Sequence, residues 1–432
     1  MFGSPSMDRL RSYIRYLNAR PKLLMLTAAS LMVLWSLSEL PRSVRFVDED
    51  LNMVAGALLI DALSNNTVHG ELAAHLGPIT TGPLVTVPAV LFYRLATDFR
   101  MARLTQYAWV ALLALSGTGL ILAQEQDKAP SRLAALMVGA GLLALMAVPH
   151  HIIEIPQILG ETAAAALALS ALAVYVKLET LGPLVAGLLL GMAIATKLVV
   201  APLAVTLMLV LLVFDRQSLL PLLASLLAVW LAWTVLRSWQ LQDSVLNTAA
   251  AELQQVLASR GSGLRAAGVG MVLARFQELE YANWPWVLKL HLWVLGASSV
   301  LLSLITLRSA RRTPRRLSSS LVALAWFVFA AWFWFTWLND TMWIRHAVVP
   351  WLLFAPLLVR STTLVENHWL QRALLGFLIV HLALGAIWIA YPRNGALQAV
   401  TNASGWWRQP EVGCSWSQMS CSPVPAALEG LN

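Results

Sequence analysis

The sequence predicts an all-α polytopic membrane protein with about eleven transmembrane helices and further helices along the outer membrane face. Composition is the first reason, because 58% of the 432 residues are hydrophobic and only 12% are charged. The second is a mean hydropathy of +0.68, carried by apolar runs that extend through most of the chain. The third is the clustering of arginines between those runs, where basic residues set the topology of membrane proteins.

The basic balance of the chain points to lipid rather than nucleic acid. The net charge is +8, and the isoelectric point is about 9.9. On a soluble protein these values would suggest a nucleic-acid partner. Here the basic residues lie between apolar runs, so we expect contacts with the anionic headgroups of membrane lipids and no nucleic-acid partner.

The N-terminal segment 1–22 is expected in the cytoplasm, because basic residues precede the first apolar run. These residues are Arg9, Arg11, Arg15, Arg20 and Lys22. The run itself covers about residues 23–41 and has no clear small-residue cleavage site. We therefore interpret it as a retained transmembrane helix.

Three consecutive carboxylates, Asp48, Glu49 and Asp50, follow this span in a large outer segment, residues 42–104. A membrane protein keeps few acids near its lipid boundary unless they serve a purpose. Residues 51–61 carry an apolar stripe and predict a helix along the membrane surface. The acids would stand at the start of that helix, where they could do chemistry or merely stabilise its N-terminus through the helix dipole.

A short apolar stretch, residues 84–97, closes this outer segment. It has about 14 residues, fewer than the roughly 20 that a spanning helix needs. We interpret it as an interfacial or half-buried helix. The alternative, a full span, would place Arg100 and Arg103 in the cytoplasm.

The remaining apolar runs predict the other spans. They lie at about 105–123, 133–149, 163–177, 219–236, 286–307, 320–337, 347–359 and 373–391. Between them, the stretch 182–213 is too long for one span and short for two. Lys197 and Pro202 in its middle predict a pair of short helices that meet near the outer face.

The charges between the apolar runs predict on which side of the membrane each connecting segment lies. The arginine cluster at 308–316 is the strongest in the chain and is expected in the cytoplasm. A transmembrane domain then covers residues 23–391, with a second large outer segment at 237–285. The polar tail, residues 392–432, lies outside. Its two cysteines, Cys414 and Cys421, are close in sequence and suit a small disulfide loop in an oxidising compartment.

The sequence lacks the motifs of several common nucleotide-binding, metal-dependent and redox sites. The sequence has no P-loop, no G-x-G-x-x-G after a strand, no H-E-x-x-H and no C-x-x-C. Few charges interrupt the apolar runs, which argues against a voltage sensor or a proton relay. No internal repeat supports an inverted-repeat transporter. The polar chemistry collects instead in the outer segments.

A set of segments, in order along the chain, resembles the GT-C glycosyltransferases. They are Arg45–Leu51, the Gly-Pro-rich residues 77–83, Leu91–Leu95, Pro149 with residues 150–161, Gly187–Lys197 and Trp343–Pro350. This superfamily includes protein O-mannosyltransferases and the aminoarabinose and lipopolysaccharide-core sugar transferases. The chain departs from the family pattern with Gly77-Pro78 in place of a His-Pro-Pro segment, and with His346 in place of a tyrosine.

The resemblance implies an enzyme of a bacterial inner membrane with its active site facing the periplasm. The donor would be a monosaccharide on a polyprenyl phosphate, and transfer would invert the anomeric carbon. The acceptor would be a hydroxyl of a glycan, a lipid or a protein such as a pilin. The rival hypothesis is a non-enzymatic lipid or polysaccharide transporter, a flippase, which would need a continuous polar path or repeat symmetry.

Candidate catalytic and donor-binding residues follow from the matched motifs. Asp48 matches the first member of the family's acidic pair, so we expect it to be the general base. Glu49 would orient Asp48 or bind a metal, and a cation is expected near two acids so close together. Arg345 and Lys197 are candidates for the donor phosphate. The alternatives are a plain loop charge for Arg345 and an ammonium that extends to the membrane surface for Lys197.

A further polar group could bind the acceptor or a divalent metal, Mg, Mn or Zn. It comprises His150, His151, Glu154, Glu161 and His346. Polar residues at the end of a span also occur at membrane interfaces without any ligand. Both interpretations stay open at this point.

Overall fold

The computed structural model describes most of the helical part of the chain. The described residues are 47–65, 81–123, 158–260, 286–310, 314–334, 345–365 and 367–390, with isolated positions between 12 and 34. Within these ranges nearly every residue is helical and none is in a strand, which confirms the predicted all-α fold class. Among the described residues, three helices are long and apolar enough to cross a membrane: Phe99–Ile121, Arg216–Leu241 and Arg315–Phe333. The chain is an integral membrane protein.

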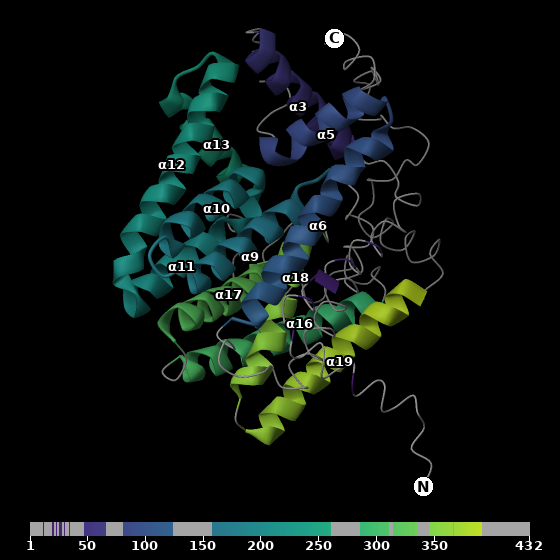
Figure 1. Ribbon diagram of the computed structural model, residues 1–432, viewed down its shortest axis with the longest axis vertical. Helices are drawn as coiled ribbons and strands as arrows, with labels where there is room; N and C mark the ends of the chain where they lie inside the picture. The colour runs from purple at the N-terminus through teal and green to yellow at the C-terminus, as the bar shows by residue number, and fades with distance from the viewer. Residues whose placement is uncertain are drawn as a thin grey trace.

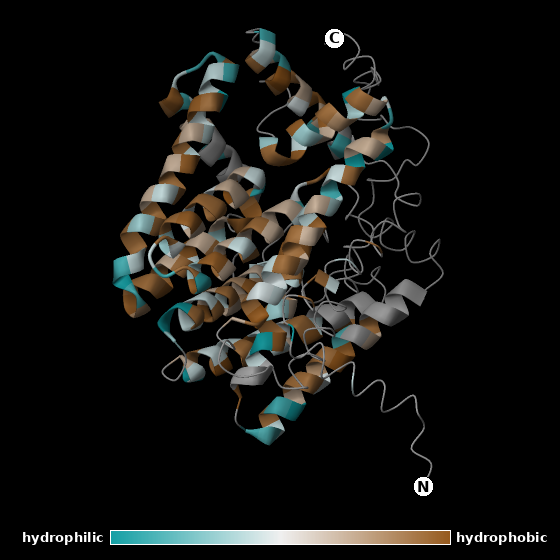
Figure 2. Cartoon of the chain, viewed as in Figure 1, coloured by the Kyte–Doolittle hydropathy of each residue, from teal (hydrophilic) through white to brown (hydrophobic). Residues whose placement is uncertain are grey.

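The described helices follow one another in a simple order. They are α3 (Val47–Asn65), α5 (Pro83–Ala96), α6 (Phe99–Ile121), α9 (Glu161–Lys177), α10 (Gly182–Thr196), the 3₁₀ turn η2 (Leu198–Val200), α11 (Ala201–Phe214), α12 (Arg216–Leu241), α13 (Val245–Arg260), α16 (Trp286–Ser309), α17 (Arg315–Phe333), α18 (Arg345–Leu364) and α19 (His368–Ala390). Apolar residues dominate the long helices of the bundle, as Figure 2 shows for α10, α11 and α12.

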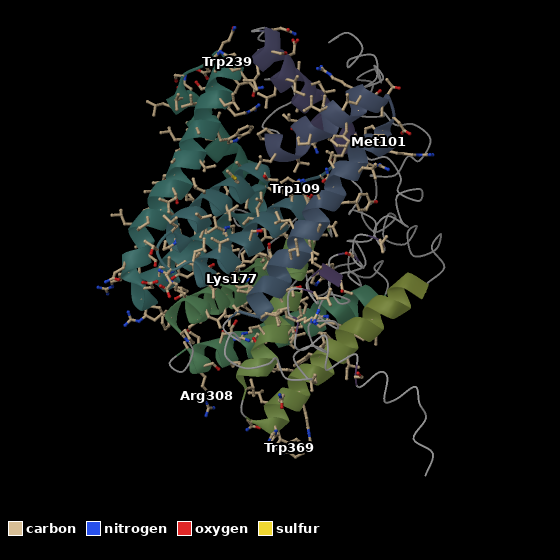
Figure 3. The ribbon with its side chains drawn as sticks, viewed as in Figure 1. Met101, Trp109, Lys177, Trp239, Arg308 and Trp369 are labelled. Carbon is tan, nitrogen blue, oxygen red and sulfur yellow. The ribbon has the colours of Figure 1, made fainter. Side chains whose placement is uncertain are left out.

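The bundle is built around α9, whose residues are buried along almost its whole length. Helices α6, α10, α17 and α18 pack against it. Helices α3 and α5 lie together at one end of the bundle, which we call the upper end (Figure 1). Met101 and Trp239 lie toward this end, whereas Arg308 and Trp369 lie at the opposite, lower end (Figure 3).

The predicted pair of short helices in 182–213 is confirmed. Helix α10 ends at Thr196, and Lys197 has an extended backbone with φ −154° and ψ 116°. The 3₁₀ turn η2 follows, and α11 carries Pro202 in its first turn. A proline there loses no intrahelical hydrogen bond, but it does not fit the interior of a continuous helix. The interruption places Lys197 on the connection between two helices.

Glycines let α10 lie very close to α12. A Cβ atom on Gly187 would overlap Ser225 Oγ and the carbonyl oxygen of Leu222, and one on Gly191 would lie 2.8 Å from Val229 Cβ. Small residues four positions apart allow helix backbones to approach closely in membranes, where packing drives helix association. This contact holds α10, the helix that leads into Lys197, against α12.

Helix α5 confirms the helix expected in 84–97. One face is buried and includes Val85, Ala89 and Val90. The other exposes apolar side chains, with Leu91 46% and Leu95 84% exposed. The helix is thus half-buried, as expected, and its location in the membrane interface remains a prediction.

Two helices begin earlier than the apolar runs suggested. Helix α6 starts at Phe99 rather than near 105, because Asp98 caps it by accepting the backbone N–H of Arg100 at 2.8 Å. Helix α17 starts at Arg315 rather than near 320, directly after Pro314. A polar cap at Asp98 and a proline at Pro314, rather than the limit of the apolar run, therefore mark these two helix starts.

Other predictions fall on residues outside the described ranges. The spans at 23–41 and 133–149, apart from isolated positions in the first, belong to this group, as do Cys414 and Cys421. The count of eleven spans and the domain limits 1–22, 23–391 and 392–432 therefore stay predictions.

A separate hydrophobic cluster holds the upper end together. Its members are Met53, Ala57, Val85, Ala89, Val90, Ala102, Ile158 and Ala163. They come from α3, α5, the start of α6, the segment that leads into α9 and the first turn of α9. This cluster brings polar residues that are far apart in the sequence to one place.

Candidate active site

Residues 158–161, the segment that leads into α9, form the centre of the candidate site. Their backbone groups bind polar side chains from three other parts of the chain: α3, the start of α5, and the break between α10 and α11. The side chains are Glu49, Asn52, Thr81 and Lys197.

The carboxylate of Glu49 is clamped by Arg103 of α6. Arg103 Nε donates to Oε1 at 3.0 Å and Nη2 donates to Oε2 at 2.5 Å, and the backbone N–H of Ile158 also donates to Oε1 at 3.0 Å. Glu49 is fully buried and Arg103 is 4% exposed. The guanidinium also lies 5.2 Å from the centre of the Phe99 ring. The cation expected beside the acids is confirmed, and it is Arg103.

This ion pair decides between the two interpretations of residues 84–97. A full span there would separate Glu49 from Arg103 by the hydrocarbon core, which is about 30 Å thick. The two side chains are instead in contact. Helix α5 therefore does not cross the membrane between them, and α6 begins on the side that carries the acids.

The backbone around the site is fixed by hydrogen bonds and close packing. Asn52 Nδ2 donates to the Ile158 carbonyl at 2.6 Å, and Thr81 Oγ1 donates to the Leu159 carbonyl at 2.9 Å. The N–H of Gly82 donates to the Thr196 carbonyl at 3.0 Å, and a Cβ on Gly82 would overlap the Ala195 carbonyl oxygen.

Lys197 and Glu161 form a second buried pair. The ammonium lies 2.9 Å from Glu161 Oε1, but it directs a hydrogen bond to the Leu159 carbonyl at 2.8 Å. Within the described part of the chain, neither oxygen of Glu161 accepts a hydrogen bond. Lys197 is 5% exposed and Glu161 3%. The ammonium is therefore buried against a carboxylate and does not extend to the membrane surface.

The structure brings Glu49, Glu161 and Lys197 to one end of the bundle. The backbone of Asp48 lies in the first turn of α3, and those of Arg345 and His346 begin α18, which contacts η2 beside Lys197. The side chains of these three residues lie outside the described part of the chain. His150, His151 and Glu154 also lie outside the described residues.

A divalent metal does not fit the two carboxylates that the structure describes. Glu49 is paired with Arg103 and Glu161 with Lys197, and a cation at each carboxylate repels a second one. Within the described residues, no group of three His, Cys, Asp or Glu side chains could hold a metal ion. Of the two roles expected for Glu49, the contacts favour orientation of the acidic turn.

Sequence reasoning missed Arg103, Asn52 and Thr81 as parts of the site. Arg103 was interpreted only as a topology charge. Asp98, a good N-cap residue just before it, was the signal that could have placed Arg103 in a helix on the acidic side.

No protein-family model matches the chain, and no curated protein matches it significantly. The chain is similar to the crystal structure of ArnT from Cupriavidus metallidurans bound to undecaprenyl phosphate, with a TM-score of 0.49 and 16% identity. The similarity covers 89% of this chain and 77% of that chain.

Proposed function

We propose that the chain is a membrane glycosyltransferase of the GT-C type. It moves a monosaccharide from a polyprenyl-phosphate donor to a hydroxyl of a glycan, a lipid or a protein such as a pilin, with inversion at the anomeric carbon. The observation that carries the proposal is the convergence of the acidic start of α3 and the Lys197 ammonium on residues 158–161. The ordered segments that resemble the family support the same function.

The acidic turn supplies the base. As the acceptor oxygen bonds to the anomeric carbon, the bond from that carbon to the phosphate oxygen breaks, and the electron pair leaves with the polyprenyl phosphate. The acceptor's proton passes to the Asp48 carboxylate. The clamp on Glu49 fixes the first turn of α3, the backbone that carries Asp48.

Positive charge stabilises the leaving phosphate. Lys197 lies on the break between α10 and α11, and α18, which begins at Arg345, contacts η2 directly after it. In the proposal both cations bind phosphate oxygens as negative charge develops there. No step of the reaction is assigned to a metal.

The upper end of the bundle faces the periplasm in this proposal. Arg308, part of the strongest basic cluster, lies at the lower end (Figure 3). Basic clusters of this kind remain in the cytoplasm. Transfer at the upper end therefore uses a donor whose sugar is already outside the cytoplasm.

The full chain reconstituted in liposomes provides the test. Polyprenyl-phosphate hexoses and pentoses are supplied with bacterial lipid, glycan and protein fractions, and the release of polyprenyl phosphate is measured together with sugar transfer. The expected result is release that depends on an acceptor and is lost in the Asp48→Asn chain. Movement of intact donor lipid between leaflets, without release of polyprenyl phosphate, would support the transporter hypothesis instead.

A further inference from the structure

Glu161 is a buried acid whose hydrogen-bonding capacity is unused. It is 3% exposed, and within the described part of the chain neither of its carboxylate oxygens accepts a hydrogen bond. Buried polar groups in proteins are almost always hydrogen-bonded, and exceptions call for a reason. Packing alone does not supply one, because an apolar side chain of similar size would fill the space without burying a charge.

Lys197 is close to Glu161 but also bonds to a backbone carbonyl nearby. The ammonium is near Oε1, at 2.9 Å, and one of its hydrogen bonds goes to the carbonyl of Leu159. That carbonyl is itself held by Thr81. The lysine has a flexible four-carbon stem, so its ammonium can turn to a new partner while the backbone stays in place.

We propose that Glu161 is a positioning residue that holds the Lys197 ammonium until the donor phosphate takes it over. The inference rests on the proposed function, in which Lys197 binds that phosphate. A buried lysine without a counter-ion would be unfavourable, so Glu161 keeps the charge in place before the donor binds. Because the ammonium is not aligned on either carboxylate oxygen, the phosphate can bind it without displacing a well-formed hydrogen bond to Glu161.

Competition for one ammonium predicts the sign of a mutational effect. Glu161 and the phosphate draw on the same positive charge, so removal of the carboxylate charge should favour the phosphate. Glu161→Gln keeps the shape of the side chain and should tighten binding of bare undecaprenyl phosphate by about fivefold or more. Glu161→Asp moves the carboxylate away from the ammonium and should tighten binding by a smaller factor. A purely structural glutamate would give weaker binding in both variants.

The experiment titrates undecaprenyl phosphate into the full chain in detergent micelles and records tryptophan fluorescence. The expected order of affinity is Glu161→Gln, then Glu161→Asp, then wild type. Lys197→Met should bind weakly, and adding Glu161→Gln to it should restore nothing. Thermal unfolding of each variant checks that it is folded, and the Asp variant alone carries the test if the Gln variant does not fold.

The outcomes separate the two levels of the proposal. Wild-type binding with equal or weaker affinity in both Glu161 variants would overturn the role of Glu161 and leave the proposed function standing. Absence of binding by the wild-type chain, together with no release of polyprenyl phosphate in liposomes, would overturn the proposed function itself. A gain that survives in the Lys197→Met background would show that Glu161 acts through another group.

Discussion

Two buried carboxylate–cation pairs meet at residues 158–161, and they differ in their hydrogen bonds. Glu49 accepts two bonds from Arg103 and one from the Ile158 N–H. Glu161 has the Lys197 charge beside it and, within the described residues, no hydrogen bond to either oxygen. Both acids are buried to a similar degree. Burial alone therefore does not distinguish the two acids, whereas their hydrogen bonding does.

The chemistry of the cations explains the difference. A guanidinium presents a planar fork that matches both oxygens of a carboxylate, so the Arg103 pair is locked in one geometry. An ammonium is a point charge on a flexible stem and can change partners. We therefore assign structure to the Glu49 pair and ligand exchange to the Glu161 pair.

The largest expected effect is a loss of activity on substitution of Asp48, which is proposed to act chemically, unlike the neighbouring Glu49–Arg103 pair. Asp48→Asn should lower the rate of sugar transfer by about 10² to 10⁴, because the reaction loses its base. The unfolding temperature should not change. Asp50→Asn, in the same acidic turn, is the matched control and should keep most of the activity. Near-normal transfer by Asp48→Asn in the liposome assay would remove Asp48 from the mechanism.

Breaking the locked pair should damage the fold. Arg103→Ala leaves the buried Glu49 carboxylate without its cation and should lower the free energy of unfolding by about 3–5 kcal/mol. Arg103→Lys should lose less, because an ammonium keeps the charge but not the fork. Denaturant titration in mixed micelles measures both. Wild-type stability of Arg103→Ala would mean that the pair is not a scaffold.

A substitution of Arg345 tests whether the donor phosphate binds beside the Glu161–Lys197 pair, as proposed. Arg345→Ala should weaken apparent donor affinity by about 10- to 100-fold, the effect of losing a hydrogen bond to a charged group. Acceptor affinity should change little, and Arg345→Lys should recover only part of the loss. The measurement is the dependence of transfer rate on each substrate. A loss confined to acceptor affinity would reassign Arg345 to the acceptor.

The smallest expected effect is the difference in coupling free energy between the two pairs, which double-mutant cycles measure directly. The coupling free energy between Glu49 and Arg103 should be about 2–3 kcal/mol, and that between Glu161 and Lys197 about 1 kcal/mol or less. Each cycle uses Gln for the acid and Met for the cation, and unfolding is followed in mixed micelles. Equal couplings would contradict the distinction between a locked and an exchangeable pair.

Local patterns in the sequence were sufficient for much of the helical framework. The short apolar run at 84–97 predicted α5, and the polar break at Lys197 with Pro202 predicted two short helices in place of one long one. These features depend on residues a few positions apart, because run length, capping and proline act within one or two turns of helix. The acidic turn at Asp48 and Glu49 was recognised on the same local scale.

The partners within the site were decided only by the tertiary structure. Arg103 meets Glu49 across 54 positions of sequence, and the Ile158 N–H meets it across 109. Lys197 reaches the Leu159 carbonyl across 38 positions. No periodicity encodes such pairs, since they depend on which helix faces pack together and on the close approach that glycines such as Gly82 and Gly187 permit. The sequence by itself determined which residues carry charge near the membrane surface, and packing determined which charge each of them meets.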